Sequence, residues 1–329
     1  MYSISKFKKR NNNNKKIVLV TGSGSIANKH IKTLLQLKYT VCSLIKSDDE
    51  KKRFSKYITK KVKFINNIKT IDSDNIFFAI IASSTHKHLN EINFFLKNRI
   101  NIFCEKPISN SLKFLKKIRK KIINNKIYFY VNYQLKKSNL VKKFISEIKG
   151  NKIYHINARV GLNLKYWRKN KTRKNSYYIN TRKGGGVIFE LVHEINLIRH
   201  IFGDILKIKT IKNKNLLKNA EDQALSLFKT KKNIPGILIQ DMLSEKKERY
   251  LEVLTSKNSI KLDFIKNKIF TFNNRRSKII KNKKEDQLDL IKMNIKSYIN
   301  WIKKGKFDIK FFDEAVRDLI ICNMMHEKF

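Results

Sequence analysis

The chain has 329 residues, which is enough for about two domains, each with its own hydrophobic core. Lys and Arg number 74 against 26 Asp and Glu, a formal net charge of +48, but the basic residues run through the whole sequence. A nucleic-acid-binding protein usually shows one clustered basic face, so this even distribution does not favour nucleic acid as the partner.

The remaining global features favour a cytoplasmic protein without a metal. The cysteines Cys42, Cys104 and Cys322 are far apart and show neither a disulfide framework nor the spacing of metal ligands. No apolar run approaches the ~18 residues of a membrane span, so no membrane partner is expected. Residues 1–15 are basic and rich in Asn, lack the apolar segment of a secretory signal, and are predicted to form a disordered tail.

Residues 16–30, KIVLVTGSGSIANKH, are predicted to form a strand, a glycine turn and a helix. Ala27 stands at the third small position of a G-x-G-x-x-G/A pattern. The first glycine permits a tight turn, the second lets backbone approach a pyrophosphate, and the helix N-terminus offers free N–H groups and a positive dipole end. This order predicts a dinucleotide site, with contacts from Gly22, Gly24, Ser25 and Ile26.

Strands and helices continue to alternate as far as residue 131. This alternation predicts right-handed crossovers and a doubly wound parallel Rossmann sheet, so residues 16–130 are assigned to a dinucleotide-binding domain. The predicted strands are 39–45, 62–65, 76–82, 101–104 and 127–131, and the predicted helices are 48–57, 85–97 and 109–123, the last with Ser109 as its N-cap.

The pattern changes beyond residue 150. Residues 131–329 are predicted to form a second, substrate-binding α+β domain with a largely antiparallel open sheet. Its predicted strands are 152–160, 205–211, 224–228, 236–242, 250–254 and 259–264, and its predicted helices are 184–202, 285–304 and 311–326.

Three further motifs are candidates for a ligand site. Residues 80–88, IIASSTHKH, follow a buried strand, and Cys104-Glu105-Lys106-Pro107 ends the next strand. The carboxyl ends of parallel strands form the ligand-binding edge of an α/β sheet. Residues 184–204, GGGVIFELVHEINLIRHIFGD, open the long helix of the second domain.

Together with the glycine turn, these motifs resemble the glucose–fructose oxidoreductase / inositol dehydrogenase family, usually written Gfo/Idh/MocA. GSGSIANKH is similar to its G-x-G-x-I-G/A-x-x-H opening, SSTHKH to its T-P-T-x-x-H turn, and EKP is its hallmark. The run WRKNKTRKNSYYINTRKGGGVIFELVHEIN is similar to a branch found in surface-polysaccharide and nonulosonic-acid sugar pathways. The chain departs from that branch at Val192 (for Ser) and Asn196 (for Asp), and from the family at Ser84 (for Pro).

The resemblance covers nearly the whole chain and implies an NAD(P)-dependent oxidoreductase. The expected reaction transfers a hydride to or from a secondary alcohol or ketone of a sugar or sugar derivative, with an anionic sugar as the expected partner. A homo-oligomer is also expected, because the second domain has an open sheet face. Further cofactor contacts are expected from Lys46, Ser47, Ser83, Ser84, Thr85, His88, Glu105 and Lys106.

The chemistry assigns roles to four side chains. Such an oxidation needs a hydride acceptor, a base for the hydroxyl proton, and a positive group that stabilises the alkoxide. Lys106 is the predicted donor to the substrate oxygen, and His193 is the predicted proton carrier near neutral pH. Glu190 lies one helical turn earlier and is expected to orient the imidazole or bind a substrate hydroxyl. Asn196 is expected to lie on the same helix face and to form hydrogen bonds with sugar hydroxyls. The histidines predicted to be structural are His30, His155, His200 and His326.

The loop at residues 164–183 has two interpretations. It carries Trp167, Arg168, Arg173, Tyr177 and Tyr178. A planar guanidinium suits carboxylate or phosphate, so the loop could form a wall for an anionic sugar. Alternatively, it packs on its own sheet.

The choice between NAD and NADP depends on the end of the second strand. An acid there accepts the ribose 2′-OH of NAD, whereas a basic residue suits the 2′-phosphate of NADP. Lys46 and Ser47 favour NADP, while Asp48 keeps NAD open.

Two other functions compete with the enzyme. A non-catalytic sugar-binding or dinucleotide-binding regulator of the same fold is favoured by Val192 and Asn196, and opposed by the intact EKP and His193. A nucleic-acid binder would have to show steeply salt-dependent binding.

Overall fold

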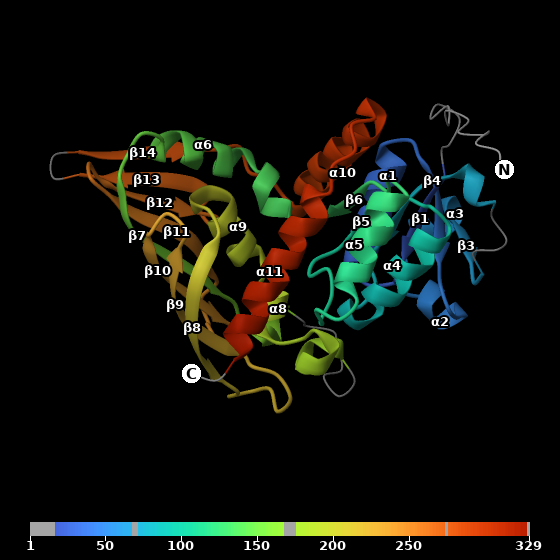
Figure 1. Ribbon diagram of the computed structural model, residues 1–329, viewed down its shortest axis with the longest axis horizontal. Helices are drawn as coiled ribbons and strands as arrows, with labels where there is room; N and C mark the ends of the chain where they lie inside the picture. Colours follow the sequence, from blue (N-terminus) through green and yellow to red (C-terminus); the bar gives the residue numbers. More distant parts are fainter. Residues whose placement is uncertain (1–16, 68–71, 168–175, 274–275, 328–329) are drawn as a thin grey trace, which may run out of the picture.

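The structure is a computed structural model that describes residues 17–67, 72–167, 176–273 and 276–327. The predicted tail at 1–15 lies outside these residues. Two sheets occupy the two ends of the molecule, and the helix α11 (Lys310–His326) runs between them, in contact with both (Figure 1). Within the described ranges, no helix is both long and apolar enough to cross a membrane.

The N-terminal sheet has six parallel strands in the order β3-β2-β1-β4-β5-β6. This confirms the predicted doubly wound sheet, whose strand order reverses between β1 and β4, at the point where such sheets bind ligands. The strands are β1 (Ile17–Thr21), β2 (Thr40–Leu44), β3 (Lys63–Ile65), β4 (Ile76–Ile81), β5 (Ile102–Cys104) and β6 (Phe129–Val131).

Helices cover both faces of this sheet, because alternate residues of a buried strand point to opposite sides. Val18 and Val20 belong to a core that includes α1 (Ser25–Gln36) and α10 (Gln287–Lys304). Leu19 belongs to the opposite core, with α4 (His88–Lys97) and α5 (Leu115–Asn124). The helix α10 comes from the predicted second domain but packs on α1, so this late segment completes the core of the first sheet.

Two predicted helices of the first domain differ from the structure. The segment 48–57 is divided into α2 (Asp48–Lys51) and the start of α3 (Lys56–Lys61). The helix predicted from Ser109 begins only at Leu115, because Phe114 has a left-handed φ of 64° and Ser109 Oγ accepts from Ser111 N (3.0 Å) in a local turn. Ser109 is therefore not the N-cap of this helix.

The second sheet has eight strands in the order β14-β13-β12-β11-β7-β10-β9-β8. Only β7 and β10 pair in parallel, which confirms the predicted, largely antiparallel sheet. The strands are β7 (Ile153–Gly161), β8 (Ile205–Asn213), β9 (Gln223–Thr230), β10 (Pro235–Asp241), β11 (Glu248–Thr255), β12 (Ser259–Asp263), β13 (Lys268–Phe272) and β14 (Ser277–Lys281).

One face of this sheet is covered by helices. α8 (Val187–Glu190) contacts β9 and β10, α6 (Asn139–Ile148) contacts β12 and β13, and α11 contacts β8. The opposite face exposes apolar side chains such as Leu227, at 63%. The other short segments are α7 (Leu164–Trp167), α9 (His193–Phe202) and the 3₁₀ turns Ser73–Asn75, Thr85–Lys87, Gln134–Lys137, Tyr177–Ile179 and Thr181–Lys183.

Candidate active site

The glycine turn has the geometry that a phosphate site needs. Gly22 has φ +83°, and a Cβ there would lie 2.5 Å from the carbonyl oxygen of Ala82, so only glycine fits. Gly24 precedes α1, and a Cβ there would meet nothing within 4 Å. Open space therefore borders the turn where Ser25 and Ile26 begin α1, and the helix N-terminus faces an approachable surface.

The end of β2 presents basic residues beside this turn. Lys46 and Ser47 are exposed, as are Asp48 and Asp49, and Glu50 Oε2 accepts from Lys46 N at 2.8 Å. Arg53 reaches back to the turn and donates from Nη1 to Ser23 Oγ at 3.4 Å. The sequence reasoning missed Arg53, since its approach to Ser23 depends on the fold of α2.

The SSTHKH turn is joined to the EKP turn by His88. Its Nδ1 lies 2.9 Å from the carbonyl oxygen of Pro107, and its Nε2 lies 3.1 Å from that of Ser83. Ser83 Oγ donates to Glu91 Oε2 at 2.9 Å. Ser84 has an extended backbone and leads into the turn that contains Thr85. The predicted contact residues thus lie together at the carboxyl ends of β4 and β5.

Glu105 is an ionised carboxylate inside the protein. His30 Nε2 and Asn132 Nδ2 each donate to its Oε1 at 2.7 Å. Burial would raise the pKa of Glu105, but these hydrogen bonds outweigh burial and lower the pKa. His30, predicted to be structural, therefore anchors the residue that precedes Lys106, a role that sequence order could not show.

The predicted long helix over 184–202 is interrupted. α8 ends at Glu190 and α9 begins at His193, so the prediction that both lie on one face of a continuous helix is wrong. In a continuous helix the Glu190 carbonyl would accept from Glu194 N, but that N–H approaches Leu191 O instead, at 3.4 Å.

The two carbonyls at the interruption take partners from other elements. Lys106 Nζ donates to Glu190 O at 2.7 Å, and the buried Gln240 donates from Nε2 to Leu191 O at 2.9 Å. The interruption thereby provides the carbonyl that holds the ammonium of Lys106 across the two domains.

His193 is a neutral imidazole. Burial, together with the charges of Lys106 and Arg249, holds the pKa of His193 well below its ordinary value of 6.5. Its Nδ1 is buried and has no hydrogen-bond partner among the described residues, which leaves Nε2 as the nitrogen for a ligand. Glu190 itself is 6% exposed, and the adjacent Glu194 pairs with Arg249 at 2.6 Å.

Asn196 is turned into the protein interior. It is 3% exposed, and its Nδ2 donates to Asp318 Oδ2 at 2.7 Å. Arg199 also contacts Asp318, whose pKa burial raises. This corrects the prediction that Asn196 contacts sugar hydroxyls, because its amide has its partner inside the protein.

The GGG loop joins the two domains. Gly184 has φ +79°, and a Cβ there would lie 2.6 Å from Thr85 Cγ2 of the SSTHKH turn. Nearby, Asn110 Nδ2 donates to Arg182 O at 2.7 Å. The loop of the second domain therefore packs directly on the first.

The sequence reasoning also missed Glu221, which holds this loop from the other side. A Cβ on Gly186 would collide with its carboxylate. That carboxylate accepts from Thr181 Oγ1 at 3.1 Å and from Ile188 N at 3.2 Å, and burial raises its pKa.

The predicted sugar-binding loop is only partly described. Trp167 ends α7 and is 38% exposed, whereas Tyr178 is 1% exposed and belongs to the core. Arg168 and Arg173 lie outside the described residues.

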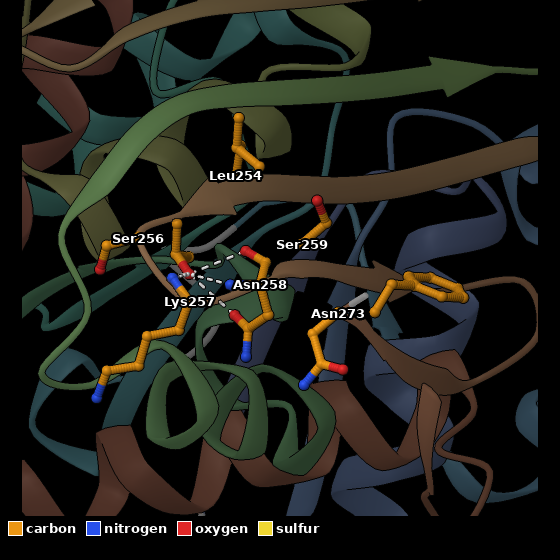
Figure 2. A pocket seen from close by; sticks show the side chains of 8 residues that line it. Leu254, Ser256, Lys257, Asn258, Ser259 and Asn273 are labelled. Carbon is orange, nitrogen blue, oxygen red and sulfur yellow. Dashed lines mark hydrogen bonds between the residues drawn. The ribbon is translucent and has the colours of Figure 1, made fainter. Parts of the chain in front are cut away.

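A separate hollow lies at the turn between β11 and β12 (Figure 2). Its polar groups bond within the turn, as when Thr255 Oγ1 donates to Asn258 O at 2.9 Å. None of the predicted site residues lines it.

Comparisons with known proteins concern the fold of the chain. Residues 16–133 match the Gfo/Idh/MocA family model, an oxidoreductase family with an NAD-binding Rossmann fold. No curated protein matches the sequence.

Similar solved structures extend over both domains. Levoglucosan dehydrogenase in complex with NADH and levoglucosan has a TM-score of 0.82 at 11% identity, over 94% of this chain and 96% of that one. UDP-N-acetylglucosamine 3-dehydrogenase from Acidithiobacillus ferrooxidans has a TM-score of 0.77 at 11% identity, with the same coverage. Biliverdin reductase from Synechocystis, in complex with biliverdin and NADP+, has a TM-score of 0.78 at 11% identity, over 94% of this chain and 99% of that one.

At these identities the structural likeness shows a shared fold. The family match over residues 16–133 coincides with the six-stranded sheet and its glycine turn. Residues 16–133 therefore have the NAD-binding Rossmann fold that the Gfo/Idh/MocA family model describes.

Proposed function

We propose that this protein is an NAD(P)-dependent oxidoreductase that transfers a hydride to or from a secondary alcohol or ketone of a sugar or sugar derivative. The observation that carries the proposal is the hydrogen bond from Lys106 Nζ to Glu190 O. It brings the lysine of EKP, at the carboxyl edge of the Rossmann sheet, to the interruption from which His193 starts α9.

The geometry supports a division of labour between these two side chains. In the oxidation direction, Lys106 transfers its hydrogen bond from Glu190 O to the substrate oxygen and stabilises the developing alkoxide. His193, kept neutral by its low pKa, accepts the hydroxyl proton at Nε2. A bound nicotinamide would supply the hydride acceptor, and the same residues would serve the reduction in reverse. Glu190 is the candidate for orienting the sugar beside them.

NADP is the cofactor that the end of β2 favours. Arg53 provides positive charge at the glycine turn, and Lys46 provides it just beyond the end of β2, as a 2′-phosphate requires. Glu50 accepts from Lys46 N and is less available to a ribose hydroxyl. Residues predicted to hold the rest of the cofactor, around Ser83 and His88, lie at the same sheet edge.

The substrate we propose is an anionic sugar from surface-polysaccharide biosynthesis. Support for a sugar comes from Trp167, which is 38% exposed at the end of α7, and from the two sugar-acting dehydrogenases of the same fold. A biliverdin reductase has the same fold and binds biliverdin, so the pocket, and not the fold, determines the substrate.

The test of this proposal is turnover of a panel of neutral and acidic sugars and nucleotide sugars with NADP+ and NAD+. The Lys106→Met and His193→Gln variants serve as matched controls. Turnover that both substitutions abolish, with the fold retained, would support the proposal, whereas equal rates in all three proteins would refute it.

A non-catalytic regulator of the same fold is the second candidate function. It is favoured by the buried state of Asn196, which leaves one polar group fewer for a substrate. Saturable cofactor binding without turnover on any acidic or neutral sugar would favour it.

We further propose that the chain is cytoplasmic and forms a homo-oligomer through the uncovered face of the eight-stranded sheet. The three cysteines are free and buried, as a reducing compartment permits. On the uncovered face, Leu227 and Ile237 are paired neighbours, exposed at 63% and 44%. Contiguous exposed apolar side chains typically mark an interface. Sedimentation should show a dimer or larger, and Leu227→Lys should yield monomer.

A further inference from the structure

His193 is oriented without a hydrogen bond to its buried nitrogen. Its Nδ1 has no such partner within the described part of the chain, although a functional imidazole is commonly fixed through its second nitrogen. The ring that packs against it is that of Tyr133, with ring centroids 6.1 Å apart and an interplanar angle of 84°. This is an edge-to-face contact between two nearly perpendicular rings.

Tyr133 is held at the end of β6, next to another residue of the site. It is 4% exposed, and its N–H donates to Val131 O at 3.0 Å. The preceding residue, Asn132, donates from Nδ2 to Glu105 at 2.7 Å and from its backbone N to Cys104 O at 2.8 Å. Two successive residues therefore contact the two parts of the site: Asn132 binds the EKP turn, and Tyr133 packs against the imidazole of His193.

The hydroxyl end of Tyr133 is buried beside Asp318 of α11. Burial and the neighbouring Asp318 raise the pKa of Tyr133 well above its ordinary value, so the phenol stays protonated. A phenol with so high a pKa is a poor proton carrier for His193. The ring is thus the part of Tyr133 that acts on the imidazole.

We propose that Tyr133 is a positioning residue for His193, whose ring fixes the plane of the imidazole and keeps water from Nδ1. Its importance for turnover rests on the proposed function, in which His193 carries the proton. Removal of the ring lets the imidazole turn and hydrates it, and hydration favours the protonated form. The charged groups around His193 stay in such a variant, namely Lys106 of the EKP turn, Glu190 of α8, Glu194 of α9 and Arg249 of β11.

The test compares Tyr133→Phe, which keeps the ring, with Tyr133→Leu, which removes it. The first readout is the NMR titration of the His193 imidazole, assigned by its absence in His193→Gln. We expect wild type and Tyr133→Phe to titrate alike, well below 6.5, and Tyr133→Leu to titrate nearer that value. We also expect kcat to fall roughly ten- to a hundredfold in Tyr133→Leu only, at unchanged cofactor affinity.

Two results would overturn the inference. One is a folded Tyr133→Leu protein whose His193 titrates as in wild type. The other is a Tyr133→Phe protein as impaired as Tyr133→Leu, because the hydroxyl would then be the acting group. If circular dichroism shows Tyr133→Leu to be unfolded, Tyr133→Met, whose longer and more flexible side chain adapts better to the space, is measured in its place. The titration needs no substrate, so a failure of the proposed function leaves this test intact.

Discussion

Lys106 Nζ and the carbonyl oxygen of Glu190 lie 2.7 Å apart, and this hydrogen bond joins the first domain to the second at the candidate site. It exists because the helix around Glu190 is interrupted and releases one carbonyl from its own ladder. A substrate oxygen that takes the place of this carbonyl would receive the same ammonium hydrogen bond, with little rearrangement of Lys106.

Replacement of Lys106 by Met should lower kcat by roughly 10²- to 10³-fold, because the alkoxide loses its charged donor. Because Glu190 O also loses its donor, the free energy of unfolding should fall by ~1–3 kcal/mol while the protein stays folded. Lys113→Met, at an exposed lysine in the next loop, is the matched control and should keep the full rate. Equal kcat in the two variants would exclude Lys106 from the chemistry.

Gly22 and Gly24 should respond differently to alanine. Gly22→Ala places a side chain at φ +83° against Ala82 O and should lower the free energy of unfolding by ~1 kcal/mol or more. Gly24→Ala meets nothing within 4 Å, so its unfolding free energy should change little, while cofactor affinity falls about tenfold because phosphate no longer reaches the backbone. Urea unfolding and cofactor titration of both variants check this. If the Gly24→Ala protein binds the cofactor with wild-type affinity, the cofactor phosphate does not contact this turn.

Gln240 should control the interruption between α8 and α9. Gln240→Leu leaves Leu191 O without its amide donor, which should cost ~1–3 kcal/mol of unfolding free energy and lower kcat while cofactor affinity is kept. Gln240→Glu, of nearly the same shape but with a second oxygen facing that carbonyl, should be at least as damaging. Steady-state or stopped-flow rates give kcat, and urea unfolding gives the free energy of unfolding. An unchanged kcat in a destabilised Gln240→Leu protein would show that the interruption has no part in catalysis.

Arg53 should set the cofactor preference. Arg53→Glu removes the positive charge beside Ser23 and should weaken NADPH binding about tenfold or more, with little loss for NADH. The comparison of dissociation constants for the two cofactors in wild type and variant checks this. If both constants change equally, Arg53 has no part in the choice.

His326 should make the fold sensitive to mild acid. Burial and the charge of Lys212 lower the pKa of His326 from 6.5 to about 4. As the pH falls, His326 therefore binds a proton in the unfolded chain before it does so in the folded protein. The stability that the neutral, buried His326 confers is complete above pH 6.5 and is lost between pH 6.5 and about pH 4. Over this pH range, the free energy of unfolding of wild type should fall by about 3 kcal/mol more than that of His326→Gln. Urea unfolding of both proteins across that range measures the difference, and parallel curves would contradict it.

The architecture was predictable because its signals are local. The glycine turn, the apolar strands and the alternation up to residue 131 predict a parallel Rossmann sheet, and the structure confirms it. The edge hairpin β13 and β14 escaped notice because lysines at both ends, such as the pair Lys268 and Lys281, mask its alternation. The amphipathic helix α6 has only ten residues and lies directly between two better-marked segments.

The errors at the site share one physical cause, namely contacts between residues distant in sequence. The helical spacing of apolar residues between 187 and 202 gives no sign of an interruption whose carbonyls are taken by Lys106 and Gln240. The inward turn of Asn196 depends on Asp318, 122 positions later. Such partners are known only once the chain is folded.

The central claim is that this chain binds a nicotinamide dinucleotide at the glycine turn. The most direct measurement is a fluorescence titration of the purified protein with NADPH and, separately, NADH, using Trp167 and Trp301 as donors and Gly24→Ala as control. The account predicts saturable binding, tighter for NADPH and weakened in Gly24→Ala. Absence of saturable binding to both cofactors would contradict the account and remove the oxidoreductase proposal with it.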